Sequence, residues 1–354
     1  MLTIRSPVFF LLLLLLGTFT SVHAAPRRKG KNSGAGTGAA VAQTPQQQAA
    51  QLAQGISQAT DGSTILDTTA TVNGLDLRFK ISGPADQFTT ASGVDGATAS
   101  PGDEGALGLN VLLHGDGGQS FFDFPNQAVQ NGLMGVVVLA PSEQLLWGQS
   151  QGQPAGLSRV DGVEHSQAVR DLIKDVLPQV AAFNSSNVFF TGVSGGSLTL
   201  SGFFVPAHGA EFAGTGVLLM CGALEPQVAV VGAEQFIGNT KIHFQSTQQE
   251  LALLQPAIPD AIVAYEQLAA DAGLSAAEVG ALQTVDNTPN GGHCEFDEQG
   301  FVSGIQLIAD NFANIMQGGD GAVRGIDAQT VLTPVVGNEN LSFQAAQKRY
   351  SLRI

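Results

Sequence analysis

Residues 187–201 read NVFFTGVSGGSLTLS, and this stretch decides how the rest of the chain is interpreted. Residues 188–191 are β-branched or aromatic and lie between polar neighbours, which is typical of a short buried strand. Residues 192–196 then fit the pattern G-x-S-x-G, and the small and apolar residues of 197–205 predict a helix. Strand, tight turn and helix in this order predict that Ser194 lies at the apex of a strained turn with its hydroxyl exposed.

Two other interpretations of this turn stay open. A chain with 44 glycines also contains glycine-rich turns that have no catalytic role. A dinucleotide-binding loop begins with a similar Thr-Gly pair, but Leu198 occupies the position of its last glycine, and the segment lies in mid-chain. A catalytic serine therefore needs a base, an acid and an oxyanion hole elsewhere in the sequence.

The N-terminus has the order of segments found in a secretory signal. A basic residue, Arg5, precedes the apolar run 8–16, and small residues lead to a cleavage site that we expect after Ala24. The apolar run is short for a bilayer span, although an uncleaved anchor is the alternative. The basic cluster at 27–31 is either a processing site or a solvated patch. We therefore expect a secreted, extracellular protein that is not membrane-bound after signal cleavage.

The charge of the chain restricts its partners. It has 15 basic and 30 acidic residues, a formal net charge of −15, and removal of the basic leader makes the mature chain still more acidic. Nucleic acid and anionic membrane surfaces repel such a protein, so we expect neither as a partner. The length of 354 residues suffices for one large domain with a substantial core, and we expect a monomer.

Two cysteines, Cys221 and Cys294, remain in the mature chain. In an oxidising compartment an even pair predicts one disulfide, with a free buried pair as the alternative. The bond would close a loop of about 70 residues and stabilise the fold by about 4 kcal/mol in the chain-entropy description. Sequons at Asn184 and Asn340 predict N-glycosylation.

Composition divides the chain after the signal at 1–24 into three parts. Residues 25–64 are rich in Gly, Ala and Gln and predict a linker. Residues 65–317 carry the apolar patterns of a folded domain, and residues 318–354 show no clear period, so we expect a poorly packed tail.

The apolar patterns predict an α/β fold. Asn73-Gly74 separates two alternating segments, 65–72 and 75–82, which predicts an antiparallel N-terminal hairpin. Short, nearly continuous apolar runs follow at 109–113, 136–139, 188–191, 217–220 and 242–245. Such strands are buried on both faces, so we expect a mostly parallel central sheet with helices on both faces. Helices are predicted at 163–180, 249–272, 275–282 and 300–317.

Histidine is the usual base for activating a serine. His165, His208 and His243 lie within or at the ends of predicted helices and strands, where a packed or surface histidine is typical. His114 lies upstream of the serine in another glycine-rich turn. His293 lies in the sequence NGGHC between the last predicted strand and the final helix. Loops at strand ends present catalytic groups, so His293 is the candidate base.

Two carboxylates are candidates for the acid that orients the histidine. Glu250 follows the carboxyl end of the strand predicted at 242–245, and Asp286 lies seven residues before His293. A solvated glutamate in the first turn of a helix is the alternative for Glu250, and a structural role is the alternative for Asp286. We favour Glu250 because it falls where a carboxylate would emerge beyond the strand.

Residues 112–118, LLHGDGG, run from an apolar strand into a glycine-rich turn. Backbone N–H groups of this turn and of Gly195 predict an oxyanion hole. A phosphate-binding loop is disfavoured because no Gly-Lys-Ser/Thr sequence follows. No histidines or cysteines have metal-ligand spacing, so we expect no metal and no cofactor.

These residues resemble the α/β-hydrolase superfamily and, within it, secreted esterases of the polyhydroxybutyrate depolymerase and feruloyl esterase kind. The resemblance covers about residues 65–317 through HGDGG at 114–118, GVSGG at 192–196, an acid after a strand, and GGHC at 291–294. It implies that Ser194 is the nucleophile, His293 the base and Glu250 the acid. It also implies that the N–H groups of Asp116 and Gly195 form the oxyanion hole.

The chain departs from this family in one respect, and agrees with some members in another. The family usually has an aspartate with a preceding glycine after the acid strand, where this chain has Thr247 and Glu250. Cys294 beside His293 is similar to esterases in which a disulfide ties the histidine loop, although their second cysteine often adjoins the serine.

The resemblance implies a secreted serine hydrolase that cleaves carboxylic esters, small or polymer-linked, through an acyl-enzyme. Phe121, Phe122, Phe124 and Trp147 are candidates for lining its pocket, with core packing as the alternative. A serine peptidase would use the same residues, and a non-catalytic secreted binding protein on the same scaffold is the alternative from another functional class.

Overall fold

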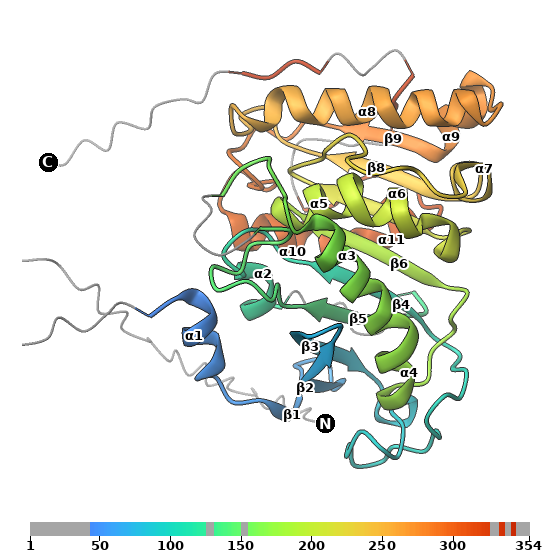
Figure 1. Cartoon of the computed structure of the whole chain (residues 1–354). Helices are drawn as coiled ribbons and strands as arrows, with labels where there is room; N and C mark the ends of the chain where they lie inside the picture. The colour runs from blue at the N-terminus through green and yellow to red at the C-terminus, as the bar shows by residue number, and fades with distance from the viewer. Residues whose placement is uncertain (1–42, 125–130, 150–154, 326–332, 337–340, 345–354) are drawn as a thin grey trace, which may run out of the picture. The chain divides into compact units, whose positions relative to one another are not determined.

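A computed structural model describes residues 43–124, 131–149, 155–325, 333–336 and 341–344 (Figure 1). All of these residues belong to one compact unit, Gln43–Ile354. The predicted signal, the basic cluster at 27–31 and the sequon at Asn340 lie outside the described residues. Within the described part of the chain, no helix combines the length and the apolar character needed to cross a membrane.

The secondary structure alternates between strands and helices along most of the chain (Figure 1). The strands are β1 (Gly55–Gln58), β2 (Thr64–Val72), β3 (Leu75–Gly83), β4 (Gly108–Leu113), β5 (Leu133–Val138), β6 (Val188–Val193), β7 (Gly216–Met220), β8 (Lys241–Gln245), β9 (Gln283–Asp286) and β10 (Thr333–Pro334). The helices are α1 (Pro45–Ala50), α2 (Gln119–Phe122), α3 (Gly162–Asp171), α4 (Leu177–Val180), α5 (Gly195–Thr199), α6 (Val205–His208), α7 (Ala233–Phe236), α8 (Leu254–Asp271), α9 (Ala276–Leu282), α10 (Phe301–Asp310) and α11 (Phe312–Met316). Short 3₁₀ or π segments are η1 (Ala85–Gln87), η2 (Leu172–Val176), η3 (Leu200–Phe204) and η4 (Gly209–Phe212).

The strands form one sheet in the order β1-β2-β3-β5-β4-β6-β7-β8-β9-β10. The strands from β5 to β9 in this order run parallel to one another, whereas β1, β2 and β3 pair antiparallel at one end and β10 pairs antiparallel with β9 at the other. The predicted fold class, a mostly parallel sheet with an antiparallel N-terminal hairpin, is confirmed.

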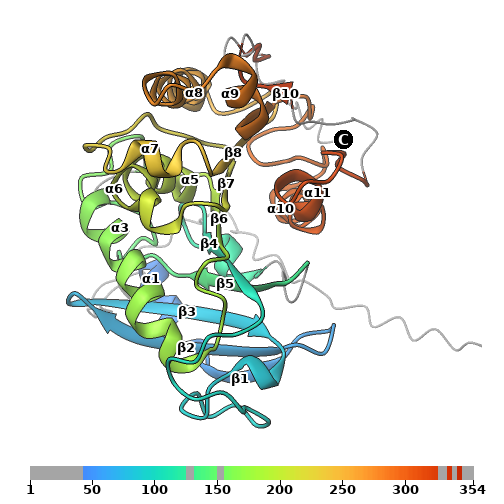
Figure 2. The same cartoon turned by 90° about the vertical axis from the view of Figure 1, so that its right-hand side faces the viewer.

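Helices cover both faces of this sheet (Figure 2). All residues of β4 are buried, and their side chains alternate between two apolar clusters. Leu109 and Val111 pack in the cluster that also contains residues of α3 and α8, whereas Leu112 packs in the cluster that contains residues of α10 and α11. Burial on both faces explains why the apolar residues of the parallel strands are continuous in sequence.

The predicted hairpin is β2 and β3, joined by Asn73 and Gly74. Both turn residues have positive φ, 53° and 84°, which is the backbone of a tight two-residue turn that Asn-Gly favours. Across the hairpin, Arg78 forms a two-pronged ion pair with Asp67, with Nε–Oδ1 and Nη2–Oδ2 distances of 2.8 Å. A third donor of Arg78, Nη1, lies 2.7 Å from the carbonyl oxygen of Ala49.

The structure differs from the sequence prediction at both ends of the domain. The predicted linker 25–64 contains α1 and β1; β1 pairs with β2 although all four of its residues are exposed. A ladder of backbone hydrogen bonds needs no apolar side chains, so composition did not indicate this edge strand. In the predicted tail, β10 pairs with β9 and the adjacent Val335 is fully buried.

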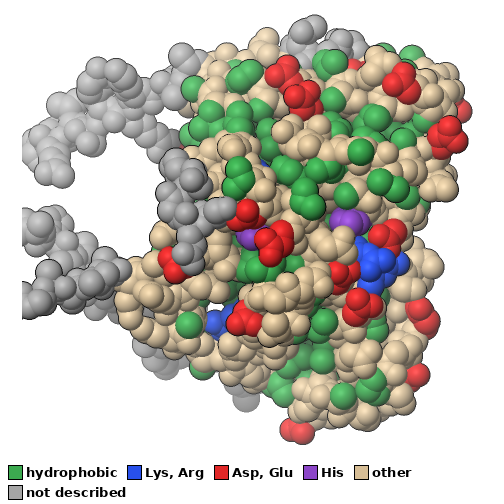
Figure 3. Space-filling view, in the orientation of Figure 1, with side chains coloured by type: hydrophobic (Ala, Val, Ile, Leu, Met, Phe, Trp, Pro, Cys, Tyr) green, Lys and Arg blue, Asp and Glu red, His purple; other side chains and the backbone are tan. Residues whose placement is uncertain are grey.

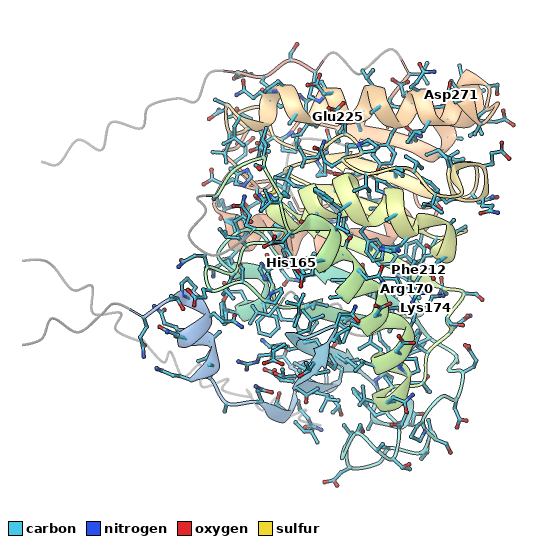
Figure 4. All side chains as sticks on the ribbon, in the orientation of Figure 1. His165, Arg170, Lys174, Phe212, Glu225 and Asp271 are labelled. Atoms are coloured by element: carbon cyan, nitrogen blue, oxygen red, sulfur yellow. A yellow bond between two sulfur atoms is a disulfide. The ribbon has the colours of Figure 1, made fainter. Side chains whose placement is uncertain are left out.

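The predicted helix at 163–180 is present as α3, η2 and α4. Charged contacts hold its outer side against η4: Arg170 Nη2 lies 2.7 Å from Glu211 Oε2, and Lys174 Nζ lies 5.1 Å from the ring centre of Phe212 (Figure 4). Acidic side chains are scattered over the face drawn in Figure 3, in keeping with the negative net charge. Partly exposed ion pairs such as that between Arg170 and Glu211 contribute little to stability.

Candidate active site

Ser194 lies between β6 and α5 in a strained backbone conformation with φ 49° and ψ −113°. The residues two positions before and after it, Gly192 and Gly196, must be glycine because the turn is packed tightly. A Cβ on Gly192 would lie 2.5 Å from Ser197 Cα, and a Cβ on Gly196 would lie 2.0 Å from the carbonyl oxygen of Leu113. Strain at a single non-glycine residue is typical of functional sites. The turn predicted from GVSGG is present, with the serine at its apex.

His293 lies within hydrogen-bond distance of Ser194. Its Nε2 atom is 2.9 Å from Ser194 Oγ, although the two residues are 99 positions apart in the sequence. Its Nδ1 atom is hydrogen-bonded to Glu250 Oε1. Because a carboxylate only accepts hydrogen bonds, Nδ1 carries the proton and Nε2 is left to accept the hydroxyl proton of Ser194.

Glu250 lies in the loop between β8 and α8, and its side chain is 0% exposed, compared with 21% for the side chain of His293. Oε1 of Glu250 also accepts the N–H of Leu251 at 2.7 Å. Hydrogen bonds join this loop to the histidine loop: Thr247 Oγ1 donates to the carbonyl of Gly292, and the N–H of Gln249 donates to that of Gly291. The structure thus links Glu250 to His293 and His293 to Ser194 by hydrogen bonds.

Asp286, the rival carboxylate, is the last residue of β9 and has other partners. Its Oδ2 accepts Gln245 Nε2 at 2.7 Å and its Oδ1 accepts the N–H of Thr288 at 2.8 Å. Burial raises the pKa of this carboxyl, and the hydrogen bonds from Gln245 and Thr288 oppose the increase. Within the described residues, no hydrogen bond joins Asp286 to His293, so the structure does not bring this acid to the site.

The glycine-rich turn at 114–118 runs alongside the serine turn, and a Cβ on Gly115 would lie 3.4 Å from Ser194 Cβ. The N–H groups of Asp116 and Gly195 have no hydrogen-bond acceptor among the residues that the structure describes. Both N–H groups are therefore available to a ligand beside the serine hydroxyl.

His114 orients this turn, a role that sequence reasoning did not assign. Its Nε2 accepts the N–H of Ala140 at 2.9 Å, so its Nδ1 carries the proton and donates to the carbonyl of Gly115 at 2.6 Å. Complete burial lowers the pKa of His114 to about 4, so the ring is neutral at pH 7. In a trans peptide the carbonyl and the following N–H point in opposite directions, so the N–H of Asp116 is directed away from His114.

A cavity of about 910 Å³ opens over Ser194 and His293. Its remaining lining residues are Gly115, Asp116, Gln119, Gly300, Phe301, Val302, Ser303 and Gln306. Residues of α10 therefore form part of the cavity wall. Among the described residues, the lining consists of glycines, apolar side chains, neutral amides, the hydroxyl groups of two serines, the ring of His293 and one carboxylate, that of Asp116.

The four aromatic residues proposed from sequence as pocket residues lie elsewhere. Phe121 and Trp147 are fully buried in the core, and Phe122 and Phe124 line a second cavity of about 570 Å³ near β1. The cavity over Ser194 is instead lined by a different phenylalanine, Phe301. The apolar pattern of 300–317 marked Phe301 only as a helix residue, because a pattern does not distinguish a residue facing the core from one facing a cleft.

Cys221, which follows β7, and Cys294 form a disulfide with their Cα atoms 5.3 Å apart. The predicted pairing is confirmed, and it ties the residue after His293 to the end of the strand next to β6. The sulfur atoms of both cysteines lie within 4.8 Å of a nitrogen of His293, but oxidised cysteines do not supply thiolate ligands to a metal.

Two other histidines are packed, as expected. His165 on α3 (Figure 4) accepts the N–H of Gly148, and burial lowers its pKa to about 4. His243 on β8 contacts Thr284 Oγ1, and burial lowers its pKa to about 3. Neither residue lines the cavity over Ser194.

No family model matches the chain, and no curated protein sequence matches it. Among solved structures, an acylaminoacyl peptidase from Pyrococcus horikoshii matches 76% of this chain at 10% identity with a TM-score of 0.43, and the chain covers 43% of its length. A carboxylesterase from Bacillus cereus matches 60% of the chain at 14% identity with a TM-score of 0.41, covering 92% of that protein.

A mutant feruloyl esterase module from Clostridium thermocellum, complexed with sinapinate, matches 72% of the chain at 10% identity with a TM-score of 0.41, covering 88% of that module. These similarities are distant. The chain's own strand order and its strained serine turn between β6 and α5 are those of the α/β-hydrolase fold, and this is the fold of the protein.

Proposed function

We propose that this protein is a serine hydrolase that cleaves carboxylic esters through an acyl-enzyme. The observation that carries the proposal is the chain of hydrogen bonds from Glu250 through His293 to Ser194, which ends in a cavity of about 910 Å³. A serine becomes nucleophilic when an adjacent base accepts its proton and a third group orients that base.

In the proposed acylation step, Ser194 Oγ attacks the carbonyl carbon of the ester while His293 Nε2 takes the hydroxyl proton. The carboxylate of Glu250 stabilises the resulting imidazolium through Nδ1–H. The carbonyl oxygen becomes an oxyanion and accepts the N–H groups of Asp116 and Gly195. The intermediate then collapses, and the leaving alcohol takes the proton from His293 Nε2.

Deacylation repeats these steps with water. His293 Nε2 takes a proton from the water as its oxygen attacks the acyl carbon. The second tetrahedral intermediate expels Ser194 Oγ, which recovers the proton from His293, and the carboxylic acid leaves. These bond changes involve only the residues named above, the ester and water.

The lining of the cavity favours an uncharged ester. Phe301 and Val302 are apolar, Gln119 and Gln306 are neutral, and the carboxylate of Asp116 is paired with Arg159. An amide substrate would meet the same groups, so ester and peptide substrates have to be compared directly.

We also propose that the protein acts outside the cell after cleavage of the leader. Support comes from the order of basic, apolar and small residues at 1–24 and from the disulfide between Cys221 and Cys294, since disulfides persist in oxidising compartments. Sequencing the N-terminus of the protein recovered from the culture medium tests this proposal; an intact Met1 would contradict it.

Labelling with a fluorophosphonate tests the hydrolase. We expect one covalent adduct, located by peptide mass spectrometry on Ser194, and hydrolysis of 4-nitrophenyl esters in preference to peptide anilides. Ser194→Ala should abolish labelling and lower kcat on the order of 10⁶-fold, as expected when a catalytic serine is removed.

Ser303 provides a matched control because it lines the same cavity and its Oγ contacts a backbone carbonyl, that of Gly300, at 3.1 Å. Ser303→Ala should retain the adduct. A folded parent protein without an adduct on Ser194 would overturn the proposed function, and faster cleavage of peptides than of esters would replace esterase by peptidase.

A further inference from the structure

Arg159 and Asp116 form a buried, two-pronged ion pair across 43 positions of sequence. Nη1 and Nη2 of Arg159 lie 2.8 Å from Oδ1 and Oδ2 of Asp116, respectively. Nη1 also lies 2.8 Å from the carbonyl oxygen of Trp147. The side chain of Arg159 is 1% exposed and that of Asp116 is 17% exposed. The pair therefore has its cation in the protein interior and its carboxylate at the wall of the cavity.

The carboxylate of Asp116 lies directly beside the proposed oxyanion hole. A Cβ added to Gly195 would lie only 2.0 Å from Asp116 Oδ1, so this oxygen packs against Gly195 Cα. The two N–H groups proposed to bind the oxyanion belong to these same two residues. A negative side chain thus adjoins the place where negative charge develops during acyl transfer.

An unpaired carboxylate at this position would repel the oxyanion and raise the barrier to its formation. Arg159 opposes that effect in two ways: its charge offsets that of Asp116, and its planar fork holds both carboxylate oxygens in one orientation. The contact with Trp147 fixes the guanidinium in turn. Since the carboxylate and the N–H of Asp116 belong to one residue, holding the side chain also restrains the backbone of the turn.

We propose that Arg159 is a positioning residue for the oxyanion hole, which it serves by neutralising and orienting Asp116. This proposal rests on the proposed ester hydrolase function. It assigns a role to a residue whose hydrogen bonds within the described part of the chain go to Asp116 and Trp147 and not to Ser194 or His293.

The test compares Arg159→Met with a matched variant at a second buried, two-pronged Arg–Asp pair. Arg78 also makes a two-pronged contact with an aspartate, Asp67, through Nε and Nη2, and its Nη1 donates to a backbone carbonyl. It lies on β3 and does not line the cavity over Ser194. Arg159→Met should lower kcat for a 4-nitrophenyl ester by about 10²-fold, the usual effect of impairing an oxyanion hole. KM should change much less, and Arg78→Met should lower thermal stability without lowering kcat.

Affinity for a boronic acid gives a second readout, because its adduct with the serine is a tetrahedral anion. Arg159→Met should weaken this inhibitor by about the same factor as kcat, whereas an uncharged, non-covalent product analogue should bind as in the parent. Asp116→Asn combined with Arg159→Met removes both charges and should recover most of the lost kcat.

The outcomes separate the two proposals. A parent protein without ester hydrolysis or an adduct on Ser194 overturns the function itself. With an active parent, a folded Arg159→Met variant that keeps its kcat overturns the role of Arg159, and failure of the double variant to recover activity overturns neutralisation as the cause. If Arg159→Met does not fold, Arg159→Lys serves instead, because it keeps the charge and loses the fork. An unaltered kcat in that variant overturns the orientation of Asp116 by the fork.

Discussion

The loop after β8 and the end of β9 each bear a buried carboxylate, and only one of the two is hydrogen-bonded to the histidine. Glu250 lies beyond the end of β8 and is hydrogen-bonded to His293 Nδ1. Asp286 ends β9 and is held by Gln245 and Thr288. The two strands are adjacent and parallel, so both carboxylates lie near the same edge of the sheet. Position at a strand end therefore does not decide which acid serves the base.

The two carboxylates differ in the hydrogen-bond donors that face them. Asp286 has two uncharged donors, and burial raises its pKa. Glu250 faces the imidazole, which can become a cation, while its second oxygen, Oε2, has no hydrogen-bond partner among the described residues. A carboxylate opposite a titratable base can stabilise a developing positive charge, whereas one opposite amides fixes a loop.

The largest expected effect comes from exchanging each acid for its amide. Glu250→Gln should lower kcat/KM by about 10⁴-fold, because the amide can donate to Nδ1 and so favours the tautomer in which Nε2 carries the proton. Asp286→Asn should leave kcat/KM close to that of the parent. Ester hydrolysis at pH 8 measures both. A larger loss for Asp286→Asn than for Glu250→Gln would reverse the comparison and reassign the acid.

Removing the disulfide, which restrains the loop of His293, is expected to lower activity less than Glu250→Gln does. Cys221→Ala combined with Cys294→Ala removes a cross-link over 73 positions, which the chain-entropy description values at about 4 kcal/mol. Loss of alignment between His293 and Glu250 should lower kcat on the order of 10²-fold. Denaturant unfolding and ester hydrolysis measure the two effects.

A reducing agent supplies the control for the disulfide prediction. In denaturant unfolding, dithiothreitol should lower the free energy of unfolding of the parent protein. It should not change that of the variant that lacks both cysteines. Equal kcat in the parent and in this variant would show that contacts around Glu250 hold His293 without the cross-link.

The smallest effect concerns the pH dependence of stability. Because burial raises the folded-state pKa of Asp286 above that of the unfolded chain, the folded state binds more protons between these two pKa values. Stability contributed by the protonated form is present below the unfolded pKa and is lost as pH rises through the folded pKa. Asp286→Asn should therefore be less destabilising at pH 7 than at pH 4. A tenfold difference between the acid dissociation constants of the folded and unfolded states corresponds to about 1.4 kcal/mol.

Urea unfolding of Asp286→Asn and of the parent protein at the two pH values measures this difference. A variant that becomes relatively less stable at pH 7 would contradict the raised pKa. It would also make Asp286 resemble a carboxylate that is paired with a cation.

Much of the fold follows from local patterns. Continuous apolar runs marked the parallel strands β4 to β8, and Asn73-Gly74 marked the hairpin turn, because both signals depend on neighbouring residues. The parallel strand β9 was not marked by such a run. The edge strands β1 and β10 were not recognised, since their pairing uses backbone groups and their side chains are exposed. The same limit applies to Phe301, whose exposure to the cavity depends on how α10 packs against the sheet.

The sequence by itself determined the succession of strands β4 to β8, the serine turn and the glycine-rich turn before it, because short-range sterics and burial specify these features. The even number of cysteines predicted their pairing. Only the tertiary structure decided which carboxylate meets His293, that His114 orients Gly115, and that Arg159 pairs with Asp116. The physical reason is common to all three: each depends on the path of loops that join distant parts of the chain. Such contacts leave no periodic signal in the sequence.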